Sequence, residues 1–254
     1  MRRYLLGLLA LLASATLQAA GTVRYCDYPV YPPVSWSDGK QPRGLAPTVV
    51  RELFGRLGYQ VEMVVLGNWQ RCLLDAAEGR VDVVLAYTSE TRAQSMRFSQ
   101  VPVLREEVAV FANRQHPLKF EKLEDLARYR GGLLFGESYG PAFDRFVAQH
   151  QNIEWVSDSG QNFGKLMRGR IDFVIQERRT GQLFVESLPG ARDIVALPQA
   201  LSVDYLRVAV SRRSPLSARM NEIDQQLLQM TDAGELERWL HESEVTYRDM
   251  VSQP

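Results

Sequence analysis

The sequence predicts an α/β protein with two similar lobes, each a mostly parallel sheet flanked by helices, and a cleft between them. The first observation is that short apolar strands alternate with amphipathic helices, the pattern of βαβ units and parallel sheets. The second is an internal echo: residues 79–85 read Gly-Arg-Val-Asp-Val-Val-Leu, and residues 169–175 read Gly-Arg-Ile-Asp-Phe-Val-Ile. Each copy has a glycine that ends a helix and an aspartate that begins a strand. We therefore expect these two segments to occupy equivalent positions in two related lobes.

The first half of the chain carries the elements of one lobe. Pro47 predicts the start of a helix, because its missing N–H costs nothing in a first turn, and Gly58 predicts the end of that helix. Four prolines make residues 28–42 a loop. The expected strands are 22–27, 61–65 and 81–86, and the expected helices are 47–57 and 69–78.

The second half repeats this alternation and ends in helices. Amphipathic spacing over 215–230 and 233–241 predicts two helices, and no strand follows them. We therefore expect this tail to pack back on one lobe. The other expected helices are 123–129, 141–150 and 163–168, and the expected strands are 132–135, 153–156 and 171–176.

Residues 1–20 have the features of a secretory signal peptide. Arg2 and Arg3 precede an apolar run over 5–12, and small residues follow it. The run is too short for a membrane-spanning helix, which needs about 20 apolar residues. We expect cleavage after Ala19 or Ala20, and export of the chain.

The charge composition argues against a nucleic-acid-binding protein. The 254 residues include 30 lysines and arginines and 30 aspartates and glutamates, so the formal net charge is zero. Such a chain lacks the basic field that binds nucleic acid.

The three histidines lie far apart in the sequence and there is no Cys-x-x-Cys motif. We therefore expect no metal site and no cofactor.

The chain has two cysteines, Cys26 and Cys72. In an exported protein the pair can persist as a disulfide. Two buried thiols that pack as small hydrophobic side chains are the alternative, and the sequence leaves both open. No lipid-attachment motif precedes Cys26, so we expect no lipid anchor.

Polar and aromatic side chains gather just after the expected strands. In open α/β sheets, ligands bind beyond the carboxyl ends of the strands. Arg92 offers a fork for a carboxylate, and Glu177 offers an anion for an ammonium group. Ser138 and Tyr139 precede a helix whose free N–H groups suit an anion. The other candidates, polar groups and rings that line or enclose a ligand, are Asp27, Tyr31, Trp36, Trp69, Tyr87, Thr88 and Ser89. Together these residue types indicate a receptor for a zwitterion rather than a reaction centre.

Four segments match the pattern of a known family. They read Asn-Trp-Gln-Arg at 68–71, Gly-Arg-Val-Asp at 79–82, Thr-Ser-Glu-Thr-Arg at 88–92 and Arg-Phe-Ser at 97–99. Through them the chain resembles the family 3 extracellular solute-binding proteins, the periplasmic receptors of polar amino acid ABC importers. The resemblance extends over about residues 22–240. It implies the type II periplasmic binding protein fold and a periplasmic location.

The resemblance also implies how the chain is divided. The first lobe is expected at 21–103 and 205–254, and the second lobe at 104–204. The two crossings between the lobes are expected near 102–107 and 201–205.

The same resemblance implies roles for individual residues. Arg92 stands where the family binds the ligand's carboxylate, and Thr88 and Ser89 lie in the turn that adds donors to it. Glu177 stands where the family usually has the aspartate that holds the ligand's α-ammonium group. The remaining correspondences are Ser138 and Tyr139 as further donors, Tyr31 and Trp69 as rings that sandwich the ligand, and Asp27 as a reader of its side chain.

The expected function is capture of a small polar ligand, an amino acid or amino-acid derivative, for an ABC permease of the inner membrane. The protein is expected to act as a monomer that closes two lobes on the ligand. A ligand receptor for a membrane sensor is one alternative. An enzyme is the other, because cyclohexadienyl dehydratases resemble this family and Asp27, Glu137 and Glu177 offer acids. The sequence has no Ser–His–Asp signature or phosphate-binding loop, so an enzyme is disfavoured.

Overall fold

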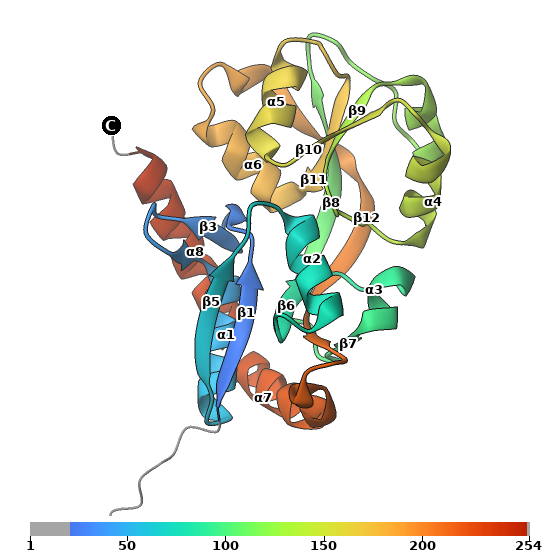
Figure 1. Ribbon diagram of the computed structural model, residues 1–254. Coiled ribbons are helices and arrows are strands. Elements are labelled where there is room, and N and C mark those ends of the chain that lie inside the picture. The colour runs from blue at the N-terminus through green and yellow to red at the C-terminus, as the bar shows by residue number, and fades with distance from the viewer. Residues whose placement is uncertain (1–20, 253–254) are drawn as a thin grey trace, which may run out of the picture.

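The computed structural model describes residues 21–252, so the signal peptide expected at 1–20 lies outside the described residues. The described chain forms an α/β protein with two lobes joined by long strands (Figure 1). No helix in this part of the chain is long and apolar enough to cross a membrane.

The first lobe is built on β1 (Thr22–Asp27), which lies between two parallel neighbours, β5 (Gln60–Val65) and β6 (Val83–Ala86). Helix α1 buries one apolar face made of Val49, Val50, Leu53 and Phe54. Asn68 caps α2 through a bond from Arg71 N–H, and Gly79 ends it in the left-handed conformation. The helices of this part of the lobe are α1 (Leu45–Arg56), α2 (Trp69–Glu78) and α3 (Glu90–Ser95).

The second lobe repeats the arrangement around β9 (Gly131–Leu134), which pairs in parallel with β10 (Ile153–Val156) and β11 (Phe173–Glu177). The predicted helix at 123–129 is a 3₁₀ helix, η1 (Leu123–Arg128). The other helical elements are α4 (Pro141–Gln149), α5 (Ser159–Met167), α6 (Arg178–Ser187) and η2 (Ala191–Asp193).

Two antiparallel strands, β8 (Leu104–Asn113) and β12 (Ile194–Ser211), run between the lobes. β8 pairs with β11 of the second lobe, and the end of β12 pairs with β6 and with β7 (Met96–Phe98) of the first. The strand order β10-β9-β11-β8-β12-β6-β1-β5 therefore passes from one lobe into the other. The lobe borders expected at residues 103 and 204 fall at the start of β8 and inside β12. These borders stay a prediction.

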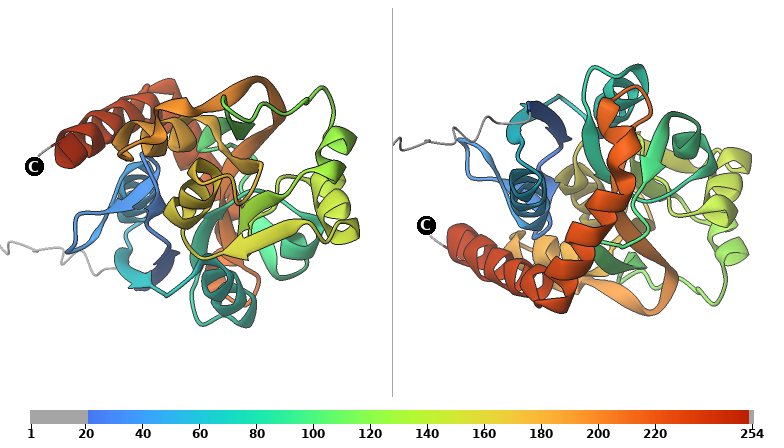
Figure 2. Two further views of the ribbon diagram at one scale, coloured as in Figure 1. Left: turned by 90° about the horizontal axis from the view of Figure 1, so that it is seen from above. Right: turned by 90° about the horizontal axis from the view of Figure 1, so that it is seen from below.

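The C-terminal tail is helical, and it is longer than the sequence predicts. It consists of η3 (Pro215–Arg219), α7 (Met220–Asp232) and α8 (Glu235–Ser252). α8 packs on α1 and α7 of the first lobe, and its last turns also contact α6 of the second lobe (Figure 2). There Trp36, Leu183 and Tyr247 form one buried apolar cluster.

Two local features lie near the cleft. One differs from the loop expected at 28–42, and the other resolves whether the two cysteines are bonded. The expected loop at 28–42 contains three short strands, β2 (Val30–Tyr31), β3 (Ser35–Ser37) and β4 (Pro42–Arg43), which form a small separate sheet. Strands of two or three residues are too short to show a periodicity in the sequence. Cys26 and Cys72 form a disulfide that ties the end of β1 to α2.

Candidate functional site

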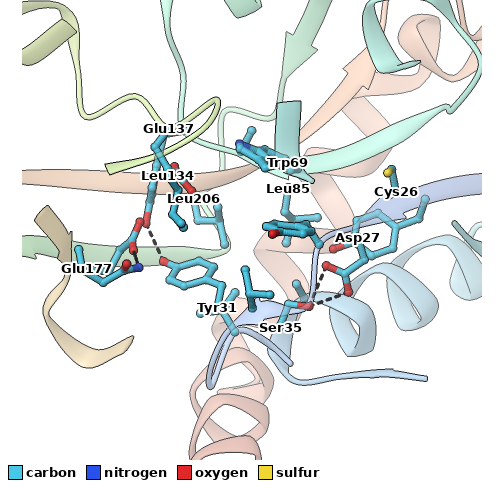
Figure 3. Close-up of a pocket in the computed structure, with 18 of the residues that line it drawn as sticks. Cys26, Asp27, Tyr31, Ser35, Trp69, Leu85, Leu134, Glu137, Glu177 and Leu206 are labelled. Carbon is cyan, nitrogen blue, oxygen red and sulfur yellow. Dashed lines mark hydrogen bonds between the residues drawn. The ribbon is translucent and has the colours of Figure 1, made fainter. Parts of the chain in front are cut away.

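A cavity of about 60 Å³ lies between the lobes, at the carboxyl ends of β1, β6 and β11 (Figure 3). Both lobes line it. Six of the residues predicted for the site meet there, which are Asp27, Tyr31, Trp69, Tyr87, Arg92 and Glu177. The strand-end rule for open sheets accounts for this convergence, because the ends of parallel strands share one edge.

Asp27 ends β1 and forms one part of the first lobe's wall. Its side chain is buried, and Ser35 Oγ lies 2.8 and 2.7 Å from its two carboxylate oxygens. Burial raises the pKa of Asp27 to about 6, while the hydrogen bond from Ser35 opposes that rise. With a pKa of about 6, the Asp27 carboxyl gains or loses its charge just below neutral pH.

Two tyrosines from the first lobe meet inside the cavity. The hydroxyl oxygens of Tyr31 and Tyr87 lie 2.6 Å apart and share a hydrogen bond. Burial raises the pKa of both phenols well above the ordinary value, and the carboxylate of Glu177 raises it further. Both tyrosines therefore stay neutral and present hydroxyl groups and ring faces to a ligand.

Arg92 is buried at the border between the cavity and the cleft mouth. Ser89 caps α3 by accepting a bond from Arg92 N–H, which places the arginine side chain in the helix's first turn. Its Nη1 donates to Tyr87 O (2.8 Å), and its Nη2 donates to Gly136 O of the other lobe (2.7 Å). Burial lowers the pKa of Arg92, and the nearby Glu137 carboxylate opposes this.

Glu177 is the second lobe's main acid. It ends β11, is 2% exposed, and accepts a hydrogen bond from Gln176 Nε2 (2.6 Å). Ser159 Oγ in turn donates to Gln176 Oε1 (2.9 Å), which fixes the amide. Burial raises the pKa of Glu177 well above its ordinary value, and the neighbouring Glu137 carboxylate adds to the rise.

Glu137 is a cavity-lining residue that the prediction did not count as ligand-binding. It follows β9, is half-buried and lines the same cavity. Burial around its carboxyl raises the pKa of Glu137, and the Arg92 guanidinium lowers it. The signal was present in the sequence, since Glu137 lies in the polar segment after an expected strand. The other lining residues that sequence reasoning missed include Ser35, Leu85, Leu134, Gln176 and Leu206.

Trp36 was predicted for the site, but it does not line the cavity. Its Nε1 donates to Ser243 Oγ (3.1 Å), and its ring packs edge-on against Tyr247. Successive side chains of a strand point to opposite faces. Since Ser35 of β3 faces Asp27, the adjacent Trp36 faces the C-terminal helix.

Four further predicted residues also lie off the cavity lining. Ser89 caps α3, and Ser138 Oγ donates to Asp144 Oδ2 (2.6 Å); both line a groove at the cleft mouth. Thr88 is exposed, and the buried Tyr139 packs edge-on against Phe143. Ser89, Ser138 and Tyr139 are used in local capping and packing rather than in the cavity lining.

The two lobes touch across the cleft, so this structure is closed. Arg92 of the first lobe binds Gly136 O of the second, and the Tyr28 hydroxyl donates to Ser157 O. Gly136 has a φ of +86°, and a Cβ there would lie 3.2 Å from the backbone of Gln70. A glycine is therefore required where the two lobes approach each other.

Comparisons with known proteins agree with this architecture. A family model for the bacterial extracellular solute-binding proteins, family 3, matches residues 23–242. No curated protein was similar enough in sequence to count as a match. Among solved structures, the amino acid ABC transporter substrate-binding protein AbpA from Streptococcus pneumoniae, bound to L-arginine, has a TM-score of 0.76 at 18% identity. That alignment covers 93% of this chain and 99% of AbpA.

Two other solved structures share the fold. A mutant of the protein ArgBP from T. maritima has a TM-score of 0.75 at 18% identity, covering 89% of this chain and 96% of its own. A histidine kinase sensor domain, described as similar to periplasmic binding proteins, has a TM-score of 0.74 at 20% identity. It covers 86% of this chain and 96% of its own. With the match over residues 23–242, the chain belongs to the family 3 bacterial extracellular solute-binding proteins.

Proposed function

We propose that this protein captures a small amino-bearing solute, such as an amino acid or an amino-acid derivative, by closing its lobes around the cavity. The observation that carries the proposal is that Glu177 is buried in a cavity lined by both lobes and forms no ion pair within residues 21–252. A buried carboxylate without a cationic partner is costly. A ligand ammonium group supplies that partner and offsets the cost.

Closure follows from the way the lobes are joined. β8 and β12 are the long strands that link the two halves, while the polar contacts of Tyr28 and Arg92 across the cleft run from side chains to backbone oxygens. Such an arrangement suits hinge motion around a ligand that touches both lobes. The ligand would bridge Tyr31, Trp69 and Tyr87 of the first lobe and Glu177 of the second, and so stabilise the closed state.

Delivery to an ABC permease in the inner membrane is the role we propose for the loaded protein, which acts in the periplasm as a monomer. Membership of the family and the likeness to ABC transporter binding proteins support this role. A receptor that reports the ligand to a membrane sensor is the second candidate, because a histidine kinase sensor domain shares the fold over 86% of this chain. The family and the structures compared are binding proteins and sensors, and no catalytic family is indicated.

The test is a thermal-shift screen of the chain without residues 1–20 against amino acids, their derivatives, amines and small carboxylates. A ligand at 100 times its Kd adds about 2.7 kcal/mol to stability, which raises the Tm of a chain this size by about 5–10 °C. Glu177→Gln is expected to weaken binding by about 30-fold or more, since a buried charge pair lost on one side costs about 2–5 kcal/mol.

Glu121→Gln is the matched control, because the side chain of Glu121 is 72% exposed and is not among the residues that line the cavity. It should leave the Tm shift unchanged. The proposal would be contradicted if no amine-bearing compound in the screen raised the Tm. It would also be contradicted if the Glu177→Gln variant bound the ligand as tightly as the control variant. Uptake of the labelled ligand by cells with and without the protein then separates an importer from a sensor.

A further inference from the structure

We propose that the ligand is a linear diamine, with an amino group at each end and no carboxylate, and that Glu137 selects it over the corresponding amino acid. This proposal rests on the binding function proposed above and names its substrate class. It follows from the balance of charge in the cavity, the bonding of Arg92 and the distribution of acids along the cavity.

The cavity carries more acid than base. Asp27, Glu137 and Glu177 line it, and Arg92 is the cationic side chain among its lining residues. With all four groups ionised, the lining has a formal charge of −2, from three negative charges and one positive. None of the three carboxyls takes part in an ion pair within residues 21–252; the pairs behind the cavity use Glu106 and Glu107 instead. Such a site is complementary to a dication rather than to a neutral zwitterion.

Arg92 is poorly placed to receive a ligand carboxylate. Two of its donors are directed to backbone oxygens, Tyr87 O at 2.8 Å and Gly136 O at 2.7 Å. Glu137 directly follows Gly136 and lines the cavity beside Arg92, so the guanidinium already faces an acid of the protein. A carboxylate approaching Arg92 would meet the like charge of Glu137, which disfavours it.

The acids lie at two ends of the cavity. Figure 3 shows Glu137 and Glu177 at one end and Asp27 with Ser35 at the other. Apolar and aromatic side chains lie between the two ends, and those labelled there are Tyr31, Trp69, Leu85 and Leu206. A chain of methylene groups fits an apolar middle, and an ammonium group at each end fits the carboxyls. This is the shape of a linear diamine.

The acidic end also predicts the effect of pH on binding. Burial raises the pKa of Glu137 and of Glu177, and the Glu137 carboxylate adds to the rise at Glu177. A diamine binds the ionised pair, so its affinity should rise with pH through the range in which the pair loses its proton. The titratable groups that face this pair are Tyr28 after β1, Tyr31 from β2, Tyr87 after β6, Arg92 from α3, Glu106 from β8 and Tyr139 after β9. Of these, Arg92 is the group that favours ionisation of Glu137.

The experiment is isothermal titration calorimetry of the chain without residues 1–20, with pairs of probes that differ only by a carboxylate. The pairs are 1,4-diaminobutane with L-ornithine and 1,5-diaminopentane with L-lysine. In at least one pair the amine should bind about 10-fold more tightly or better than the amino acid, which is about 1.4 kcal/mol. Glu137→Gln should reverse that preference by weakening the amine and strengthening the amino acid, a result that a merely structural residue would not produce.

Each outcome decides a different claim. Tighter binding of the amino acid in every pair would overturn the diamine assignment while leaving the proposed binding function intact. A diamine preference that Glu137→Gln does not change would overturn the role of Glu137. Binding of neither class would overturn both proposals. Glu121→Gln should behave as the unaltered protein throughout.

Discussion

The two lobes share one structural corner, and the first copy lies where β1 begins. Arg24 N–H donates to Asp82 Oδ2 (2.9 Å), and Asp82 N–H donates back to Arg24 O (2.8 Å). The Arg24 guanidinium also donates from Nη2 to Gly79 O (3.0 Å), the residue that ends α2. Arg24 thereby ties the start of β1 to Asp82, which precedes β6, and to the residue that ends α2.

The second copy has nearly the same geometry. Arg130 N–H donates to Asp172 Oδ2 (2.8 Å), and Asp172 N–H donates back to Arg130 O (2.7 Å). Arg130 Nη2 donates to Gly169 O (3.1 Å). The sequence echo between 79–85 and 169–175 therefore corresponds to one hydrogen-bonded corner built twice.

The surroundings of the two corners differ. Asp82 accepts an additional bond from Ser214 Oγ (2.8 Å), and its side chain is 12% exposed. Asp172 has no such partner among the described residues, and its side chain is 35% exposed. The C-terminal tail, which returns to the first lobe, accounts for the difference. The local motif thus sets the bonds, while the rest of the chain sets how much each bond contributes to stability.

The largest expected effect comes from a feature of the first lobe alone, the disulfide between Cys26 and Cys72. It closes a loop with a sequence separation of 46 residues. Losing it in a Cys26→Ser, Cys72→Ser double variant should lower the free energy of unfolding by about 4 kcal/mol, because the unfolded chain gains freedom. Chemical denaturation with and without a reductant measures this. The second lobe differs, because its helix α5 only packs closely on β9 at Gly132 and is not joined to that strand by a covalent link. Equal midpoints for the oxidised protein and the variant would contradict the prediction.

The second effect is the pH dependence of stability that Asp27, the acid in the first lobe's wall, should produce. The pKa of Asp27 is about 6 in the folded protein, compared with an ordinary value of 3.8. The folded state holds this proton more tightly, so the stability it contributes is full below about pH 4. That stability is lost as the pH rises through about 6, by about 3 kcal/mol for a shift of about two units.

Asp27→Asn tests this sign, because an asparagine does not titrate. The difference in unfolding free energy between the variant and the unaltered protein should shift in favour of the variant, by up to about 3 kcal/mol, from pH 4 to pH 7. Ser35 is a partner at both pH values, so its altered bond largely cancels in this comparison. Asp232→Asn, at an exposed position, serves as the control. The same pH dependence in Asp27→Asn and in the control would refute the assignment.

Much of the fold follows from local patterns. Residues 22–27, 69–78 and 153–156 form the predicted elements with unchanged bounds. Helix α5 begins four residues before the predicted start, because Asp158 caps it and accepts a bond from Gln161 N–H. Helix α8 continues past residue 241, because Leu236, Leu240, Ser243 and Tyr247 keep one face buried although it is not purely apolar.

The site was less predictable than the fold. The strand-end rule located Asp27, Tyr87 and Glu177, since it depends only on the position of strands. Trp36 lies outside the cavity lining, because the face of a residue in a three-residue strand is decided by tertiary packing, here against Ser243. The strand-end rule undervalued Glu137, because nothing in the sequence shows which loop side chains turn inward.

The smallest expected effects compare the two corners directly. Asp82→Ala leaves the Arg24 N–H and the Ser214 hydroxyl without their acceptor in a buried setting, which should cost about 2–3 kcal/mol. Asp172→Ala exposes the Arg130 N–H to water, so the expected cost is about 1 kcal/mol. Urea denaturation of both variants measures the two values.

A double-mutant cycle shows whether Ser214 is the reason for that gap. In a Ser214→Ala background, Asp82→Ala should lose part of its effect, and the costs of the two aspartate variants should move closer together. Asp172→Ala should cost the same in both backgrounds, because Ser214 bonds the other corner and the two sites are expected to be independent. If the gap between Asp82→Ala and Asp172→Ala stays unchanged without Ser214, burial by the tail as a whole, rather than this hydroxyl, makes the first corner the more stabilising of the two.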